Sequence, residues 1–262
     1  MIKFMKKSIL IITTLLLTIA LSACGNKSIT AEEALTKSTE ASKNMKSTEF
    51  TSNSVTEMIS GEQTRKIETK LSGSLIIEPL AMHTTTELKN QNQTQNVEMY
   101  LKDGAAYIKA TGQNQWIKNT SATITAQFEN MKKLASSDEI LNFYKKVAKD
   151  FKITEENGNY VLTYSGSGEQ FKDLISAVLK SSGSGAQANS ILNNVEFKNV
   201  SIKYVVKKND FTPISNETTM ELTAKNSSNN TMKMTQNITY SNVNKVSEIT
   251  LPDEAKNAKE VK

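Results

Sequence analysis

The clearest pattern in this sequence is an alternation of apolar and polar side chains over residues 67–77. Ile67, Thr69, Leu71, Gly73, Leu75 and Ile77 alternate with charged and small polar residues. Because successive side chains on a strand point to opposite faces, the alternation predicts a long strand with one apolar and one polar face. The same period predicts further strands from residue 49 and at residues 80–88, 97–101, 106–109, 116–118, 160–164, 195–206, 214–224 and 232–240, with a short one around Ile153.

Short polar turns separate these predicted strands. Asn90 to Gln93, Asp103-Gly104, Asn157-Gly158 and Asn209-Asp210 are each typical of a tight connection between neighbouring strands, and a longer polar turn is expected at residues 226–230. The predicted sheet is therefore antiparallel. The apolar positions shift from odd to even numbers at Lys198-Asn199, which predicts a β-bulge that bends the sheet.

Three capping boxes, in which a hydroxyl and a carboxylate or amide satisfy the first amides of a helix, predict helix starts at residues 30–33, 136–139 and 167–170. Helical spacing of apolar residues follows each of them, most clearly at residues 171–179. Helical spacing also predicts a helix at residues 124–134 and a short one at 186–192. The expected fold is α+β: an antiparallel sheet whose apolar face is covered by these helices, as a single domain over residues 30–252. Residues 253–262 are expected to be a flexible, solvated tail after Pro252.

The first 23 residues have a different pattern. Lys3, Lys6 and Lys7 precede an apolar run from Ser8 to Ala20, which is shorter than the roughly 20 residues that span a bilayer. A basic head, a short apolar run and small residues predict an export signal peptide over residues 1–23. Residues 24–29 are then expected to be a short tether.

The sequence Leu21-Ser22-Ala23-Cys24 resembles the lipobox of bacterial lipoproteins. This resemblance implies cleavage before Cys24, a diacylglycerol thioether on its sulfur and an acyl chain, such as palmitate, on its new amino terminus. Two or more acyl chains hold a protein stably at a membrane, whereas one does not. The expected location is the outer face of the cytoplasmic membrane, most simply the surface of a Gram-positive cell.

The composition excludes several classes of function. Without the three signal-peptide lysines, 29 basic residues stand against 27 acidic ones, a net charge of about +2 that does not favour nucleic acid. Cys24 is the only cysteine and His83 the only histidine. No catalytic motif, metal site or cofactor is predicted, and the chain is not expected to be an enzyme. His83 occupies an odd position in a strand whose apolar side is even, so it is expected to face water.

The mature chain also resembles a family. The runs Met99 to Lys109 and Trp116 to Lys118, with Val243-Asn244 and Glu248 to Pro252, are similar to the central hairpins and the closing strand of Gram-positive lipoproteins of unknown function. Those proteins are related in shape to the carriers LolA and LolB and to the lipoproteins LppX and LprG. The resemblance implies a strongly curved half-barrel, with helices on its concave face and an apolar cavity between sheet and helices.

Apolar and methionine side chains on the predicted sheet and helices are the candidate cavity lining: Phe128, Met131, Phe143, Phe171, Leu174, Ile175, Val178, Met220, Met232 and Met234. Methionine adapts to irregular apolar partners such as acyl chains. The same residues also suit ordinary core packing. The leading hypothesis is a membrane-anchored lipoprotein that binds a lipid or another hydrophobic molecule. The alternative is an interaction scaffold that docks an envelope protein.

Overall fold

The computed structural model describes residues 29–121, 126, 129–130, 133, 138–180 and 192–261. Residues 1–28, which include the expected signal peptide, Cys24 and most of the expected tether, lie outside the described residues, as do residues 186–191 and most of the helix expected at 124–134. Within the described residues, no helix has the length and hydrophobicity that a membrane span requires. Residues 31–262 form one compact unit.

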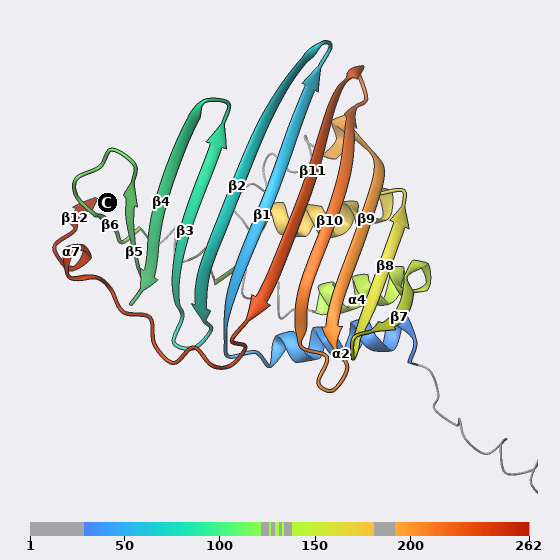
Figure 1. The fold of residues 1–262 in the computed structure, drawn as a ribbon, viewed down its shortest axis with the longest axis horizontal. Helices are drawn as coiled ribbons and strands as arrows, with labels where there is room; N and C mark the ends of the chain where they lie inside the picture. Colours follow the sequence, from blue (N-terminus) through green and yellow to red (C-terminus); the bar gives the residue numbers. More distant parts are fainter. Residues whose placement is uncertain are drawn as a thin grey trace, which may run out of the picture. The chain divides into compact units, whose positions relative to one another are not determined.

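One large, curved and unclosed sheet dominates this unit (Figure 1). Its spatial order is β12-β6-β5-β4-β3-β2-β1-β11-β10-β9-β8-β7, and all neighbours except β12 and β6 are antiparallel. The strands are β1 (Ser47–Ser60), β2 (Gln63–Ile76), β3 (Ala81–Asn90), β4 (Gln93–Lys102), β5 (Ala105–Ala110), β6 (Ile117–Asn119), β7 (Lys152–Glu156), β8 (Asn159–Gly166), β9 (Val195–Lys207), β10 (Pro213–Ala224), β11 (Ser227–Ser241) and β12 (Lys259–Val261). The expectation of a large antiparallel sheet is confirmed.

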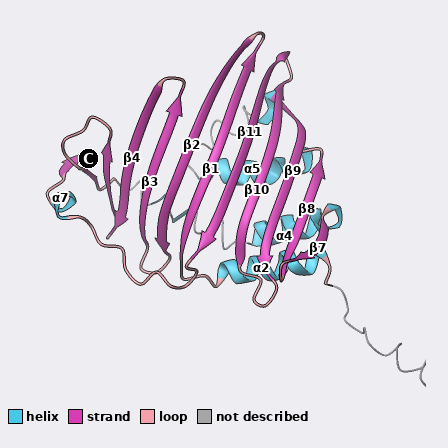
Figure 2. Cartoon of the chain, in the orientation of Figure 1, coloured by secondary structure: helices cyan, strands magenta, loops and turns pink. Residues whose placement is uncertain are grey.

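Helices α2 (Ala31–Lys43), α4 (Asp138–Val147) and α5 (Lys172–Leu179) lie behind the β8–β10 part of the sheet in Figures 1 and 2. Leu35 of α2 is buried, and the neighbouring Ser38 hydroxyl bonds to Tyr204 of β9. Short 3-10 turns follow α4 (η1, Ala148–Asp150) and precede α5 (η2, Glu169–Phe171). These helices therefore cover one face of this half of the sheet.

The start of α5 differs from the capping box expected at residues 167–170. The Ser167 hydroxyl accepts a hydrogen bond from the amide of Glu169 at 3.4 Å, one residue earlier than the box requires. The Glu169 carboxylate, one residue before the box residue Gln170, accepts from the amide of Phe197 in β9 at 3.2 Å and also pairs with Lys172 of α5. The bond to Phe197 ties the start of α5 to β9.

Strand register joins the apolar side chains into one continuous surface. Met220 of β10 pairs with Met234 of β11, which pairs with Thr56 of β1, which in turn pairs with Ile67 of β2. Because directly paired residues project to the same side, this row and its neighbours form a single face. We call it the apolar face; it is the face that the helices cover at β9 and β10. The predicted bulge is confirmed: Glu221 pairs with Asn199 and Leu222 with Phe197, which leaves Lys198 as the extra residue.

The C-terminal strap, residues 242–261, corrects two expectations. Residues 253–261 are not a solvated tail: they form α7 (Asp253–Lys256) and β12, and β12 pairs in parallel with β6. Val243-Asn244 and Glu248 to Pro252, expected to form a closing strand, do not join the sheet. The physical reason is tertiary packing, since the strap buries Ile249 and Ala255 against the sheet.

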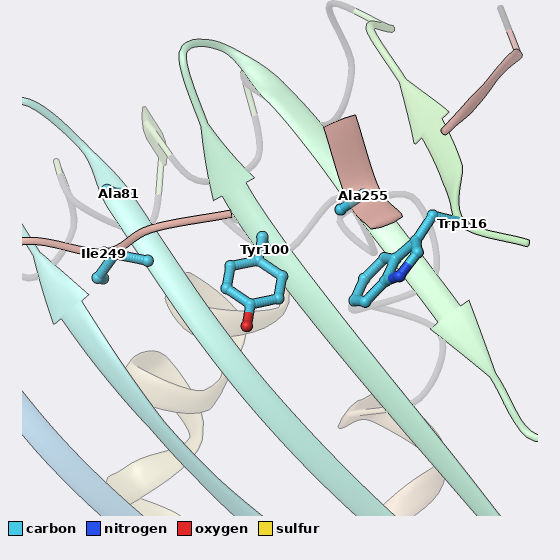
Figure 3. Close-up of a cluster of buried hydrophobic side chains, with 5 residues drawn as sticks. All are labelled: Ala81, Tyr100, Trp116, Ile249 and Ala255. Carbon is cyan, nitrogen blue, oxygen red and sulfur yellow. The ribbon is translucent and has the colours of Figure 1, made fainter. Parts of the chain in front are cut away.

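The strap covers the side of β3 to β6 opposite the apolar face. Ile249 and Ala255 join Ala81, Tyr100 and Trp116 in one buried cluster, and the five side chains are drawn in Figure 3. Polar contacts add to this packing. Lys102 donates to the carbonyl of Ile249 at 2.8 Å, and Lys109 pairs with Glu254 at 2.8 Å. The strap therefore covers this end of the sheet.

Candidate functional site

A cavity of about 160 Å³ lies between the three helices and the sheet. Each layer contributes to its wall: α2 and α4 one residue each, α5 two, and strands β9 and β10 six. The lining residues are Leu35, Tyr144, Phe151, Phe171, Leu174, Ile175, Val200, Ile202, Tyr204, Asn216, Thr218 and Met220. Most of these side chains are apolar, and none of them carries a charge near neutral pH.

Packed aromatic rings support one side of the cavity. The Phe171 ring lies 5.4 Å from Phe143 and 5.1 Å from Tyr164, centroid to centroid, and Phe151 lies 5.4 Å from Tyr164. Tilted and edge-to-face pairs at these distances contribute about 0.5–1.5 kcal/mol each beyond area burial. The ring cluster joins α4, η2, β8 and Phe151, which follows η1, so it holds the helices at a defined distance from the sheet.

The polar groups of the cavity are hydroxyls and one amide. The Tyr204 and Ser38 hydroxyl oxygens lie 2.6 Å apart, and Ser38 is 1% exposed. The Thr218 hydroxyl donates to the side-chain oxygen of Asn216 at 2.8 Å. Burial raises the pKa of the Tyr204 and Tyr144 phenols above the ordinary value of 10.0. Neighbouring tyrosines raise these pKa values further, because two phenolates close together would repel each other. The site is therefore uncharged as well as largely apolar.

The residues predicted to line the cavity fall into four groups in the structure. Phe171, Leu174, Ile175 and Met220 contribute to its wall. Phe143 is buried in the ring cluster beside it, whereas Val178 is 45% exposed on α5. Met232 and Met234 are half-buried on the apolar face, beyond the cavity. Phe128 and Met131 lie outside the described residues.

Sequence reasoning missed several lining residues, among them Tyr204, Tyr144 and Leu35. For Tyr204 a signal was present, because Val200, Ile202 and Tyr204 alternate on β9 and face the cavity together. For Leu35 of α2 and Tyr144 of α4 the helical stripe was visible, but nothing in the sequence indicates which strand the stripe meets.

His83 is less exposed than its position in the strand suggested. It lies opposite the apolar face as expected, but its ring stacks on Tyr100 with centroids 4.2 Å apart, and its Nε2 lies 3.0 Å from a Glu98 carboxylate oxygen. Tyr100 donates to the same carboxylate oxygen at 3.1 Å. Desolvation, together with the Glu98 charge, raises the pKa of Tyr100 to about 12. The three side chains satisfy one another, and among the described residues no cluster of His, Cys, Asp and Glu could hold a metal ion.

A wider hollow of about 700 Å³ lies on the opposite face, over β1 to β5. Its lining is mainly polar, and its charges are paired within the protein: Lys70 with Glu87 at 3.4 Å, and Lys109 with Glu254 at 2.8 Å. Eleven of its fourteen lining residues are polar or charged, whereas most residues around the smaller cavity are apolar. The smaller cavity under the helices is therefore the better candidate site.

Comparisons with known proteins give a family and a set of structures. Residues 30–260 match a protein family described as "Family of unknown function (DUF6612)". No curated protein matches the chain. The solved structures with similarity include LprF from Mycobacterium bovis, at 12% identity over 86% of this chain and 96% of that one, with a TM-score of 0.41. They also include a putative outer membrane lipoprotein-sorting protein domain from Vibrio parahaemolyticus, at 11% identity over 87% and 98%, with a TM-score of 0.30.

Proposed function

This chain belongs to the DUF6612 family, whose function is unknown, and we propose that it binds a lipid or a similar hydrophobic molecule between its helices and its sheet. The observation that carries the proposal is the uncharged, mainly apolar cavity under α2, α4 and α5. Ligand sites are typically concave and mostly apolar, with a few polar groups that orient the ligand. The cavity has both features.

The size of the cavity indicates what part of a ligand it holds. An apolar cavity of about 150 Å³ takes up benzene, so one of about 160 Å³ holds a group of that size. Six buried carbons gain about 5 kcal/mol at ~0.8 kcal/mol each, whereas association costs at least about 4 kcal/mol. A benzene-sized group alone therefore binds weakly. A useful affinity requires a longer ligand that extends beyond the cavity.

The apolar face offers a path for such an extension. Met220 lines the cavity and pairs with Met234, while Met232 in the next row pairs with Met58. Met58 is 36% exposed, and the other three side chains are half-buried. Methionine adapts to the irregular outline of a flexible chain. A ligand with one end in the cavity would extend its acyl chain along this row of methionines.

The proposed setting is the outer face of the cytoplasmic membrane. The lipobox-like sequence at Cys24 supports a covalent diacylglycerol anchor after export. Such an anchor would hold the binding domain within reach of membrane lipids, whose acyl chains match the chemistry of the cavity. In this setting the protein is a binding protein and not an enzyme.

Blocking the cavity tests the proposal. Full-length protein purified from membranes is extracted with organic solvent, and the extract is analysed by mass spectrometry for a ligand in stoichiometric amount. Ile175→Trp fills the cavity and is expected to lower the bound ligand at least about tenfold, while Val178→Trp, one turn along on the exposed side of α5, leaves it unchanged. Thermal denaturation checks that both variants fold.

A ligand that persists unchanged in Ile175→Trp would contradict the proposed site. A protein that carries no apolar ligand from any preparation, and that cross-links in cells to one stoichiometric protein partner, would contradict the function. That result would favour the envelope scaffold instead.

A further inference from the structure

Hydroxyl groups from three elements lie in the cavity wall or directly behind it. Tyr204 projects from β9 and lies 2.6 Å, oxygen to oxygen, from Ser38 of α2. Ser42, one turn further along α2, also contacts the Tyr204 phenol, and its own hydroxyl donates to the carbonyl of Ser38 at 2.9 Å. Tyr144 of α4 lies on the same wall. A small polar patch therefore sits inside an apolar enclosure.

This patch has hydrogen-bond donors to offer. Tyr204 and Ser38 each have one O–H. When Ser38 donates to Tyr204, the Tyr204 O–H is left for another acceptor, either the Ser42 oxygen or a ligand oxygen. The Tyr144 hydroxyl is not hydrogen-bonded to any other residue in the described part of the chain. A ligand oxygen in the cavity could therefore accept a hydrogen bond from this patch.

The lining contains no group that could balance a ligand charge. None of the twelve side chains around the cavity belongs to Lys, Arg or His. Moving an unpaired carboxylate or phosphate into such surroundings is far more costly than moving a neutral ester or alcohol. The raised pKa of the Tyr204 phenol has the same cause, because the surroundings resist a negative charge.

We propose that the bound ligand is an uncharged amphiphile, an acyl ester or a fatty alcohol, whose oxygen accepts hydrogen bonds from the Tyr204 and Tyr144 hydroxyls in the cavity wall. The inference rests on the proposed function and adds the chemical class of the ligand. The acyl part leaves the cavity past Met220 along the apolar face. Free fatty acids and lipids with an anionic head at this position are excluded by the same lining.

Photo-cross-linking with three matched probes tests the class. The full chain is placed in nanodiscs, and each probe has the same alkyl chain with a diazirine but ends in a methyl ester, a carboxylate or a plain methyl group. Labelled peptides from α5 and β9 are quantified by mass spectrometry. The methyl ester is expected to label these peptides about tenfold more than the carboxylate.

Tyr204→Phe removes the hydroxyl and keeps the ring. It is expected to lower ester labelling about threefold to tenfold, which corresponds to one neutral hydrogen bond, and to leave labelling by the plain hydrocarbon unchanged. The control is Tyr160→Phe on β8, whose ring stacks on Phe211 and does not line the cavity. Ser38→Ala gives a second, independent change to the same patch.

The inference would be overturned if the ester and the carboxylate labelled the protein equally, or if Tyr204→Phe and Ser38→Ala left ester labelling unchanged. Labelling by the plain hydrocarbon would in that case still support an apolar site. Absence of labelling by all three probes would contradict both the proposed function and this inference. The two failures are therefore distinguishable.

Discussion

At the scale of single residues, the tyrosines show how strongly the interior resists charge. Tyr100, Tyr144, Tyr204 and Tyr240 belong to different elements, and burial raises the pKa of each phenol. Tyr100 belongs to the buried cluster under the strap, whereas Tyr144 and Tyr204 line the cavity. The Tyr100 and Tyr204 hydroxyls form hydrogen bonds without introducing a charge, so tyrosine has the same role on both faces of the sheet.

Alkaline pH is expected to destabilise the protein through these phenols. The unfolded chain loses phenol protons at the ordinary pKa of 10.0, whereas Tyr100 in the folded chain holds its proton up to about 12. The unfolded state therefore binds fewer protons in this window, and the free energy of unfolding falls as pH rises from about 10 to about 12. Urea unfolding at a series of pH values measures the fall. Tyr204→Phe should make it shallower, and a free energy independent of pH in this window would contradict the prediction.

At the scale of elements, the C-terminal strap stabilises one end of the sheet. Its helical turn α7 places Ala255, which is 0% exposed, in the cluster with Trp116, and its last residues pair with β6. Three lysines of the sheet, Lys102, Lys109 and Lys118, each reach a glutamate of the strap. Exposed ion pairs contribute little, about 0–1 kcal/mol each, so the apolar cluster is the main attachment.

A charge placed in this cluster is expected to detach the strap. Ala255→Asp buries an unpaired carboxylate and should lower the free energy of unfolding by more than about 2 kcal/mol. Trp116 is the only tryptophan in the chain, so its fluorescence should shift to longer wavelength as the indole meets water. Asn257→Asp adds the same charge at an exposed position of the strap and serves as the control. Unchanged fluorescence in Ala255→Asp would mean that the strap does not cover Trp116 in solution.

At the scale of the whole molecule, the sheet has two faces with different covers. The apolar face is covered by helices at β8 to β10, and the opposite face is covered by the strap at β3 to β6. Rows of half-buried methionines connect the helix-covered part of the apolar face to the central strands. The cavity is thus the enclosed end of a longer apolar surface, which is the arrangement that the proposed ligand requires.

The proposed anchor makes a prediction for the full chain. Cys24→Ala should abolish incorporation of labelled palmitate. It should also release the protein from membranes, because the apolar run from Ser8 to Ala20 is too short to span a bilayer. Cys24→Ser provides a second variant without the sulfur. Metabolic labelling followed by membrane fractionation measures both effects. Membrane retention with normal processing in Cys24→Ala would contradict the lipobox interpretation.

The sequence alone determined the elements whose signals are local. Alternation identified the long strands, Asp103-Gly104 and Asn157-Gly158 identified hairpins, and the change of phase near Lys198 identified the bulge. Each of these depends on the residue and its near neighbours, through side-chain direction on a strand or through backbone conformation in a turn. One apolar face and an antiparallel sheet follow from them.

Only the tertiary structure decided where distant segments meet. Ser38 and Tyr204 are 166 positions apart, and no periodicity indicates that their hydroxyls bond. Residues 253–262 were predicted to be a solvated tail after Pro252. Residues 253–261 are instead ordered, because Ile249 and Ala255 pack against the sheet. The alternating pattern determines which side of a strand is apolar, whereas the packing of helices and strap determines which part of that side becomes a cavity.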